Sequence, residues 1–127
     1  MSLDISPLIP TGRQVIQTYR GGAFRISQVD YAGPVLVLPD RTMTWSPPAF
    51  TDLALADFDA IRGPDAIVQV LLLGCGDKML LPTAALRKAL KDVGVVIEPM
   101  DTGAACRTFN VLMGEDRRVA AALFPAS

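Results

Sequence analysis

Apolar and polar residues alternate in the first part of the chain, which is typical of half-buried β-strands. Phe24 and Ile26 are separated by Arg25 and followed by Ser27, so one face of this segment is apolar and the other polar. The glycine pair Gly21-Gly22 precedes it as a turn signal. Residues 15–19 are therefore predicted to pair with residues 23–27 as a β-hairpin.

Three more short segments of the first half have the same strand character. They are residues 29–31, 34–38 and 42–45, and the prolines Pro34, Pro39, Pro47 and Pro48 lie at their boundaries. Residues 52–61 carry apolar side chains at mixed helical spacing, which predicts a short helix.

The second half begins with a different pattern. Residues 66–73 are almost wholly apolar, which predicts a strand covered on both faces, ending at Gly74-Cys75-Gly76. Pro82 is predicted to open a helix with an apolar stripe that ends before Gly94. Residues 95–100 form the next strand, so the segment reads as a βαβ unit with two parallel strands. The apolar stripe consists of Leu86, Ala89, Leu90 and Val93.

The end of the chain is predicted to be helical. This last helix begins near Thr102, is bent or broken at Gly114 and resumes through Ala122, with Glu115 and Asp116 near the positive end of the resumed segment. Together these elements predict one α/β domain over residues 1–127. We expect a β-rich N-terminal half and a C-terminal βαβα unit.

Composition excludes several classes of function. The chain has 127 residues, 50% of them hydrophobic, a net charge of −1 and a pI of about 5.2. Such a chain can bury a core, but it has no basic patch for nucleic acid or anionic membranes. Since it contains no histidine, histidine-based nucleophile pairs and histidine zinc sites are excluded.

The spacing of the two cysteines predicts their oxidation state. Cys75 and Cys106 are far apart and form no Cys-x-x-Cys pair, which argues against a disulfide framework and a structural zinc site. We expect free thiols, no metal, no cofactor and a reducing cytoplasmic compartment. The N-terminus shows no signal-peptide pattern, and the longest apolar run is too short to span a bilayer.

A candidate site lies where the two predicted parallel strands end. Their carboxyl ends meet at one edge of the sheet, where α/β folds usually bind ligands, so Gly74–Gly76 should lie near residues 100–103. The following helix adds a face with Gly103, Arg107 and Asn110 at helical spacing. The candidate ligand-binding residues are Gly74, Cys75, Gly76, Asp101, Thr102, Cys106, Arg107 and Asn110.

Each of these residues also has a structural interpretation, and we favour it. The glycines can form a turn, because Gly-x-Gly alone is a weak phosphate-binding motif. Asp101 and Thr102 can cap the helix. Cys106 can be a small buried residue instead of a thiol activated by Arg107, and Arg107 can pair with an acidic residue such as Asp101 or Glu115.

The stretch from Met100 to Leu123, preceded by Leu-Leu-Leu-Gly-Cys-Gly at residues 71–76, resembles the Mth-type single-domain family. The hallmark Met-Asp-Thr-x-x-Ala-x-x-Thr-aromatic-Asn is matched by Met100, Asp101, Thr102, Ala105, Thr108, Phe109 and Asn110. The resemblance extends from about residue 16 to residue 124 and includes Trp45. It implies a three-layer α/β arrangement with a mixed central sheet.

The resemblance implies no established activity, cofactor or catalytic residue. Members are bacterial and archaeal proteins, and eukaryotic relatives include the mitochondrial complex I assembly factor 3 and the adipogenesis-associated Mth domain-containing protein. Two hypotheses follow. The first is a non-enzymatic module that contacts another protein or an assembly intermediate of a membrane complex. The alternative is a small-molecule or anion-binding domain, or a small enzyme, using the groove between Gly74–Gly76 and Asp101–Arg107.

Overall fold

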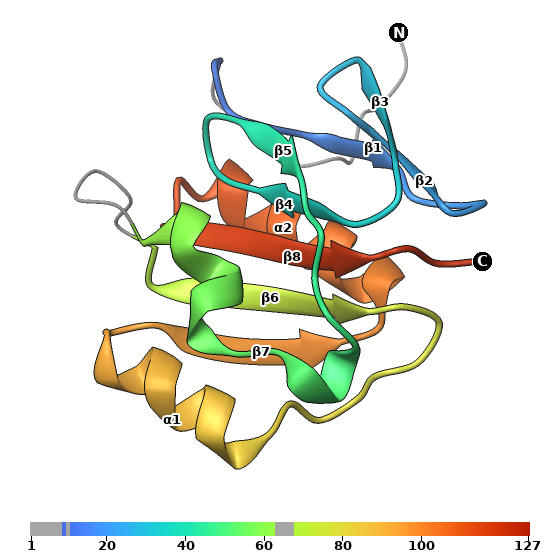
Figure 1. Cartoon of the computed structure of the whole chain (residues 1–127). Coiled ribbons are helices and arrows are strands. Elements are labelled where there is room, and N and C mark those ends of the chain that lie inside the picture. The colour runs from blue at the N-terminus through green and yellow to red at the C-terminus, as the bar shows by residue number, and fades with distance from the viewer. Residues whose placement is uncertain (1–8, 10, 63–67) are drawn as a thin grey trace, which may run out of the picture.

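The described residues form two β-sheets, with two α-helices and two 3-10 segments around the larger one (Figure 1). The computed structural model describes residues 9, 11–62 and 68–127. The smaller sheet has the order β1-β2-β3, and the larger has the order β5-β4-β8-β6-β7. The strands are β1 (Ile16–Thr18), β2 (Ala23–Ile26), β3 (Val29–Ala32), β4 (Val35–Val37), β5 (Thr42–Thr44), β6 (Val70–Cys75), β7 (Val96–Met100) and β8 (Val119–Phe124). The helical elements are η1 (Phe50–Asp52), η2 (Leu55–Ile61), α1 (Ala84–Asp92) and α2 (Thr102–Gly114).

The larger sheet is mixed, as the family resemblance implied. Strand β6 runs parallel to β7 and to β8, whereas β4 runs antiparallel to β5 and β8. The β6-α1-β7 unit and the β1-β2 hairpin are confirmed. Strand β6 begins at Val70 and runs through Cys75, whereas residues 66–73 were predicted; residues 66 and 67 lie outside the described part of the chain. The sequence did not show that β1–β3 would form a sheet of their own while β4 and β5 join the larger one.

The prediction for the end of the chain was wrong. Helix α2 stops at Gly114, and the segment after it is β8, the central strand of the larger sheet. The three alanines at 120–122 favour a helix by less than about 1 kcal/mol each, but this strand is buried on both faces between β4 and β6, which outweighs that preference. Asp116 turns the chain with a φ of 55°. Glu115 and Asp116 therefore follow the C-terminal end of α2 and do not precede a helix.

Two other helix predictions need smaller corrections. The short helix predicted over residues 52–61 is replaced by two 3-10 segments, η1 and η2, with residues 53 and 54 between them. In η2, Leu55, Phe58 and Ile61 repeat every three residues, which is the 3-10 period. Helix α1 begins after its N-cap Thr83, two residues later than the predicted start at Pro82. Gly94 ends it in a left-handed conformation, with a φ of 84°, as expected.

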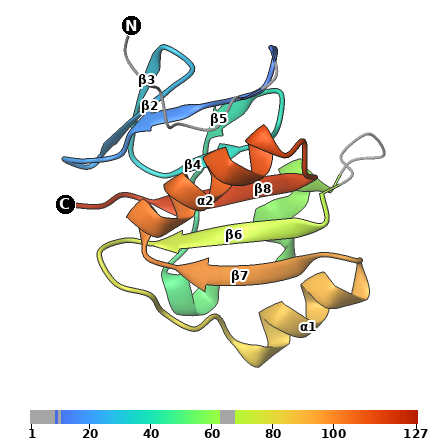
Figure 2. The ribbon, with the colours of Figure 1, turned by 180° about the vertical axis from the view of Figure 1, so that it is seen from behind.

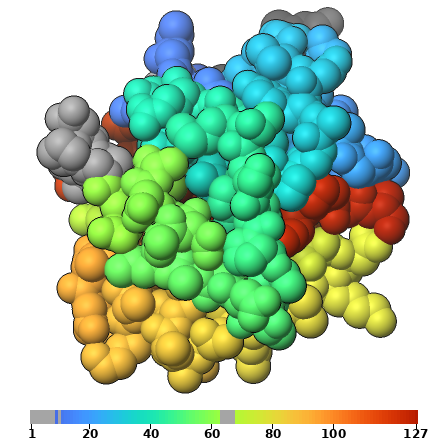
Figure 3. Space-filling view, viewed as in Figure 1, coloured from blue at the N-terminus to red at the C-terminus, as the bar shows by residue number. Residues whose placement is uncertain are grey.

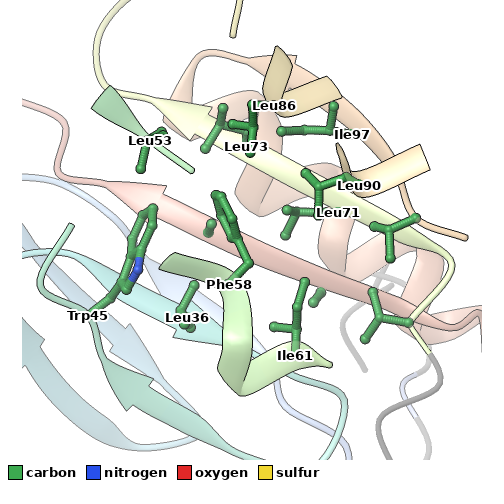
Figure 4. Packing of buried hydrophobic residues seen from close by; sticks show 14 of the residues in the cluster. Leu36, Trp45, Leu53, Phe58, Ile61, Leu71, Leu73, Leu86, Leu90 and Ile97 are labelled. Atoms are coloured by element: carbon green, nitrogen blue, oxygen red, sulfur yellow. The ribbon is translucent and has the colours of Figure 1, made fainter. Parts of the chain in front are cut away.

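The larger sheet separates two apolar cores. Within β6, Leu71 and Leu73 point to one face, where α1 and η2 lie, and Leu72 points to the other. Figure 4 shows the first core, with Phe58 of η2 and Leu90 of α1 over the same face of the sheet. Figure 3 shows the chain from β5 to η2 covering that face. The opposite face is covered by α2 (Figure 2), and the smaller sheet packs beside α2 in the same core. The molecule therefore has three layers.

Candidate functional site

The ends of β6 and β7 meet as predicted, and Thr102 joins them. The Thr102 N–H donates to the Gly76 carbonyl at 2.8 Å, and the Gly76 N–H donates to Thr102 Oγ1 at 2.8 Å. The hydroxyl in turn donates to the Phe124 carbonyl at 2.6 Å. The fully buried Thr102 thus ties β6, α2 and β8 together, and it uses the Gly76 amide that a ligand at this turn would need.

Close packing requires a glycine at position 74. A Cβ on Gly74 would lie 2.8 Å from Leu123 Cδ2 and 3.1 Å from Thr102 Cα, distances at which atoms overlap. A glycine therefore lets α2 start directly against β6. Gly76 has a φ of 92°, which suits a glycine that turns the chain.

Asp101 is the N-cap of α2. Its Oδ1 accepts a hydrogen bond from the Ala104 N–H at 2.9 Å. A carboxylate here also opposes the positive end of the helix dipole. This geometry agrees with the structural interpretation of Asp101.

Both cysteines are free, and they occupy different environments. Burial raises the pKa of the Cys106 thiol to about 12, and neighbouring Arg107 opposes this shift only in part. Burial also raises the pKa of the half-buried Cys75, whose Sγ donates to the Leu80 carbonyl at 3.4 Å. Because the thiolate is the reactive form, neither side chain is activated as a nucleophile at neutral pH.

The outer face of α2 packs against β1. Asn110 Oδ1 accepts from the Ile16 N–H at 2.9 Å, and Asn110 Nδ2 donates to the Ile16 carbonyl at 2.8 Å. Arg107 Nη1 donates to the Tyr19 hydroxyl at 2.8 Å. A Cβ on Gly103 would lie 3.0 Å from the Tyr19 ring. The face of α2 that helical spacing predicted is therefore present. It contacts β1 and Tyr19, the residue that follows β1.

A cavity of about 590 Å³ opens beside this contact. Its walls come from the chain around β1 and from the outer face of α2. The lining residues are Ile9, Val15, Ile16, Gln17, Tyr19, Cys106, Arg107, Asn110 and Val111. Three of the predicted site residues therefore line it, while Gly74–Gly76 and Thr102 belong to the strand-end contact. The sequence pattern did not indicate Ile16 and Tyr19 as site residues, because nothing in it connects them to a helix about ninety residues later in the chain.

The described part of the chain holds no group of three or more side chains suited to bind a metal ion. Within the same residues, no helix has the length and apolar character needed to cross a membrane.

Comparison with known proteins agrees with this fold. The family described as "Protein of unknown function (DUF498/DUF598)" matches residues 16–124. The chain belongs to this family. Its solved relatives include the crystal structure titled as an outer membrane protein from Bartonella henselae, with a TM-score of 0.81 and 32% identity over 96% of this chain and 99% of that one. The solution structure of a Mth938-like domain from Bordetella pertussis has a TM-score of 0.74 and 28% identity, covering 98% and 92%.

Two sequence relatives bear on function. An uncharacterised protein of Rhodobacter capsulatus is 38% identical over 114 residues, which is 90% of this chain and 86% of that protein. NADH dehydrogenase (ubiquinone) 1 alpha subcomplex assembly factor 3 of Xenopus tropicalis is 32% identical over 110 residues, or 87% of this chain. The match spans 60% of that assembly factor. The expected resemblance to the Mth-type family and to these assembly factors is thereby confirmed.

Proposed function

We propose that this protein is a non-enzymatic interaction module that binds another protein during the assembly of a larger complex, in the manner that the name of its assembly-factor relatives implies. The observation that carries the proposal is the 32% identity to assembly factor 3 across 87% of the chain. The neutral thiols and the absence of histidine support it, since they leave little acid–base or nucleophilic chemistry.

One edge of the molecule has the character of a contact surface. The consecutive side chains Met79, Leu80 and Leu81 are 52%, 47% and 67% exposed. Apolar side chains exposed side by side are typical of protein-binding surfaces. The Leu80 carbonyl accepts from Cys75 at the end of β6, so this loop lies at the carboxyl end of β6, whose neighbour forms the edge of the larger sheet.

Strand β7 forms that edge, with β6 as its neighbour in the described sheet. Its first residue, Val96, is 54% exposed. On the side away from β6 no strand pairs with β7 among the described residues, and Pro99 of this strand offers no backbone N–H. Residues 79–81 lie at the carboxyl end of β6, and Val96, which pairs with Val70, lies at the opposite end of β7. We name these two groups together the β7-edge surface and assign the partner contact to the edge that runs between them. A partner of matching chemistry presents apolar side chains along an extended segment.

Cross-linking of the tagged protein in native cells, followed by affinity purification and mass spectrometry, tests this function. Val96→Glu and Leu81→Glu should each reduce the recovered partner about tenfold or more, because a charge would be buried at the contact. Val29→Glu is the matched control, since Val29 is 51% exposed on β3 of the other sheet. The proposal fails if no protein is enriched over an unrelated tagged protein. The assigned surface is wrong if all three variants recover the partner equally.

A further inference from the structure

We propose that the cavity between β1 and α2 is a binding site for an aliphatic carboxylate. The chain of the ligand lies against the apolar wall, and its carboxylate binds Arg107 and Tyr19 at the mouth. This site is separate from the β7-edge surface, and it goes beyond the interaction function proposed above.

The wall of the cavity is suited to an aliphatic chain. Ile9, Val15, Ile16 and Val111 contribute apolar side chains to it. Cys106 adds a thiol that stays protonated at neutral pH, because burial holds its pKa high, so it behaves as a small apolar group. The volume of about 590 Å³ falls within the usual range of small-molecule sites, roughly 300–1,000 Å³.

The polar groups inside the cavity do not call for a polar ligand there. Asn110 uses its amide oxygen and its amide nitrogen on the backbone of Ile16. In the described residues no buried side-chain polar atom lacks a hydrogen-bond partner. A hydrocarbon chain therefore leaves no buried side-chain donor or acceptor of the described residues unsatisfied when it displaces water.

The charge at the mouth selects the head group. Arg107 is exposed and donates one hydrogen bond to the Tyr19 hydroxyl, and no salt bridge involves it among the residues that the structure describes. A guanidinium carries five N–H donors and binds carboxylates through two of them. Because the Tyr19 oxygen accepts from Arg107, its own O–H remains to donate to a carboxylate oxygen.

Nearby Asp101 does not neutralise this cation by direct contact. Its Oδ1 caps Ala104 at 2.9 Å, on the first turn of α2. Gly103 keeps the space between them open, since a Cβ there would lie 3.2 Å from Arg107 Nη1 and 3.3 Å from Asp101 Oδ1. The guanidinium, which lines the cavity, thus makes no ion pair with Asp101 in the described structure.

Titration of the isotope-labelled full chain with decanoate, decanol and acetate, followed by NMR and calorimetry, tests the site. Decanoate should bind and shift amide signals of β1 and of residues 106–111. Decanol, which has the chain without the charge, should bind about tenfold more weakly. Acetate, which has the charge without the chain, should show no saturable binding. Arg107→Gln should weaken decanoate about tenfold and leave decanol unchanged.

Matched variants distinguish binding at this cavity from nonspecific effects of charge or hydrophobicity. Arg87→Gln removes the same charge from the exposed face of α1 and should bind decanoate as wild type does. Val111→Trp fills the mouth from an exposed position and should weaken both decanoate and decanol. Val96→Glu, which tests the partner surface, should leave ligand binding unchanged. The proposal is overturned if decanoate does not bind, if it binds wild type and Arg107→Gln equally, or if the shifted signals lie outside β1 and α2.

Discussion

Asn110 of α2 and Ile16 of β1 are joined by two hydrogen bonds, from the Ile16 N–H to Asn110 Oδ1 at 2.9 Å and from Asn110 Nδ2 to the Ile16 carbonyl at 2.8 Å. The side-chain amide therefore pairs with the backbone N–H and carbonyl of Ile16 as a neighbouring strand would. Through this contact the three-stranded sheet is attached to the layer formed by α2. The contact also fixes one wall of the cavity.

Replacing Asn110 should loosen this attachment. Asn110→Ala removes both hydrogen bonds and leaves two partly buried backbone groups of Ile16 without partners, so we expect a loss of about 2–3 kcal/mol in the free energy of unfolding. Urea denaturation gives the value. Lys91→Ala on the exposed face of α1 should change it by less than about 0.5 kcal/mol. Equal stability of Asn110→Ala and wild type would contradict a structural role for this pair.

The hydroxyl group of Thr102 should contribute more to the free energy of unfolding than its methyl group does. Thr102→Val keeps the shape but leaves the Gly76 N–H and the Phe124 carbonyl without their partner, which should cost about 2–4 kcal/mol. Thr102→Ser keeps the hydroxyl and removes one methyl group, which should cost about 1 kcal/mol. Thermal unfolding of the two variants distinguishes them. If Thr102→Val is as stable as Thr102→Ser, the strand ends are held by packing alone.

The sequence predicted the elements whose pattern is decided locally. The apolar run of β6, the stripe of α1 and the stop at Gly94 together predict a parallel βαβ unit, and the meeting of Gly76 with Thr102 follows from that topology. The identity of β8 did not follow, because alanines suit a helix in isolation. Only the burial of β8 between β4 and β6 makes it a strand.

The candidate site was predictable only in part, for a related reason. Helical spacing alone shows that Gly103, Arg107 and Asn110 share one face of α2. The groups that this face binds, Ile16 and Tyr19, lie 94 and 88 residues away from their partners in the chain. A single sequence carries no signal for such a long-range contact. The cavity therefore emerges only when β1 and α2 are placed side by side in space.

The two helix caps provide a matched test of Asp101. Asp101→Ala should lower the free energy of unfolding by about 0.5–2 kcal/mol. The Ala104 N–H would lose its acceptor, and the positive end of the helix dipole would lose the opposing carboxylate charge. Thr83→Ala removes the corresponding cap of α1, in which Thr83 Oγ1 accepts from Leu86 at 3.2 Å. Arg107→Ala, at an exposed position, should be milder than Asp101→Ala. If Asp101→Ala melts as wild type does but loses partner or ligand binding, the residue is functional and not a structural cap.

Cys106 should make the protein less stable in alkali. Burial raises the pKa of its thiol from an ordinary value of 9.0 to about 12, so the folded state holds a proton that the unfolded state releases first. The stabilisation is complete below pH 9 and is lost as the pH rises from 9 towards 12. Cys106→Ala removes this dependence, at the cost of one buried sulfur. Other groups titrate in the same range, so the measured quantity is the difference in unfolding free energy between wild type and Cys106→Ala. That difference should shrink steadily with rising pH, and a difference that stays constant from pH 8 to pH 11 would show that the Cys106 thiol ionises in the folded protein as easily as in the unfolded chain.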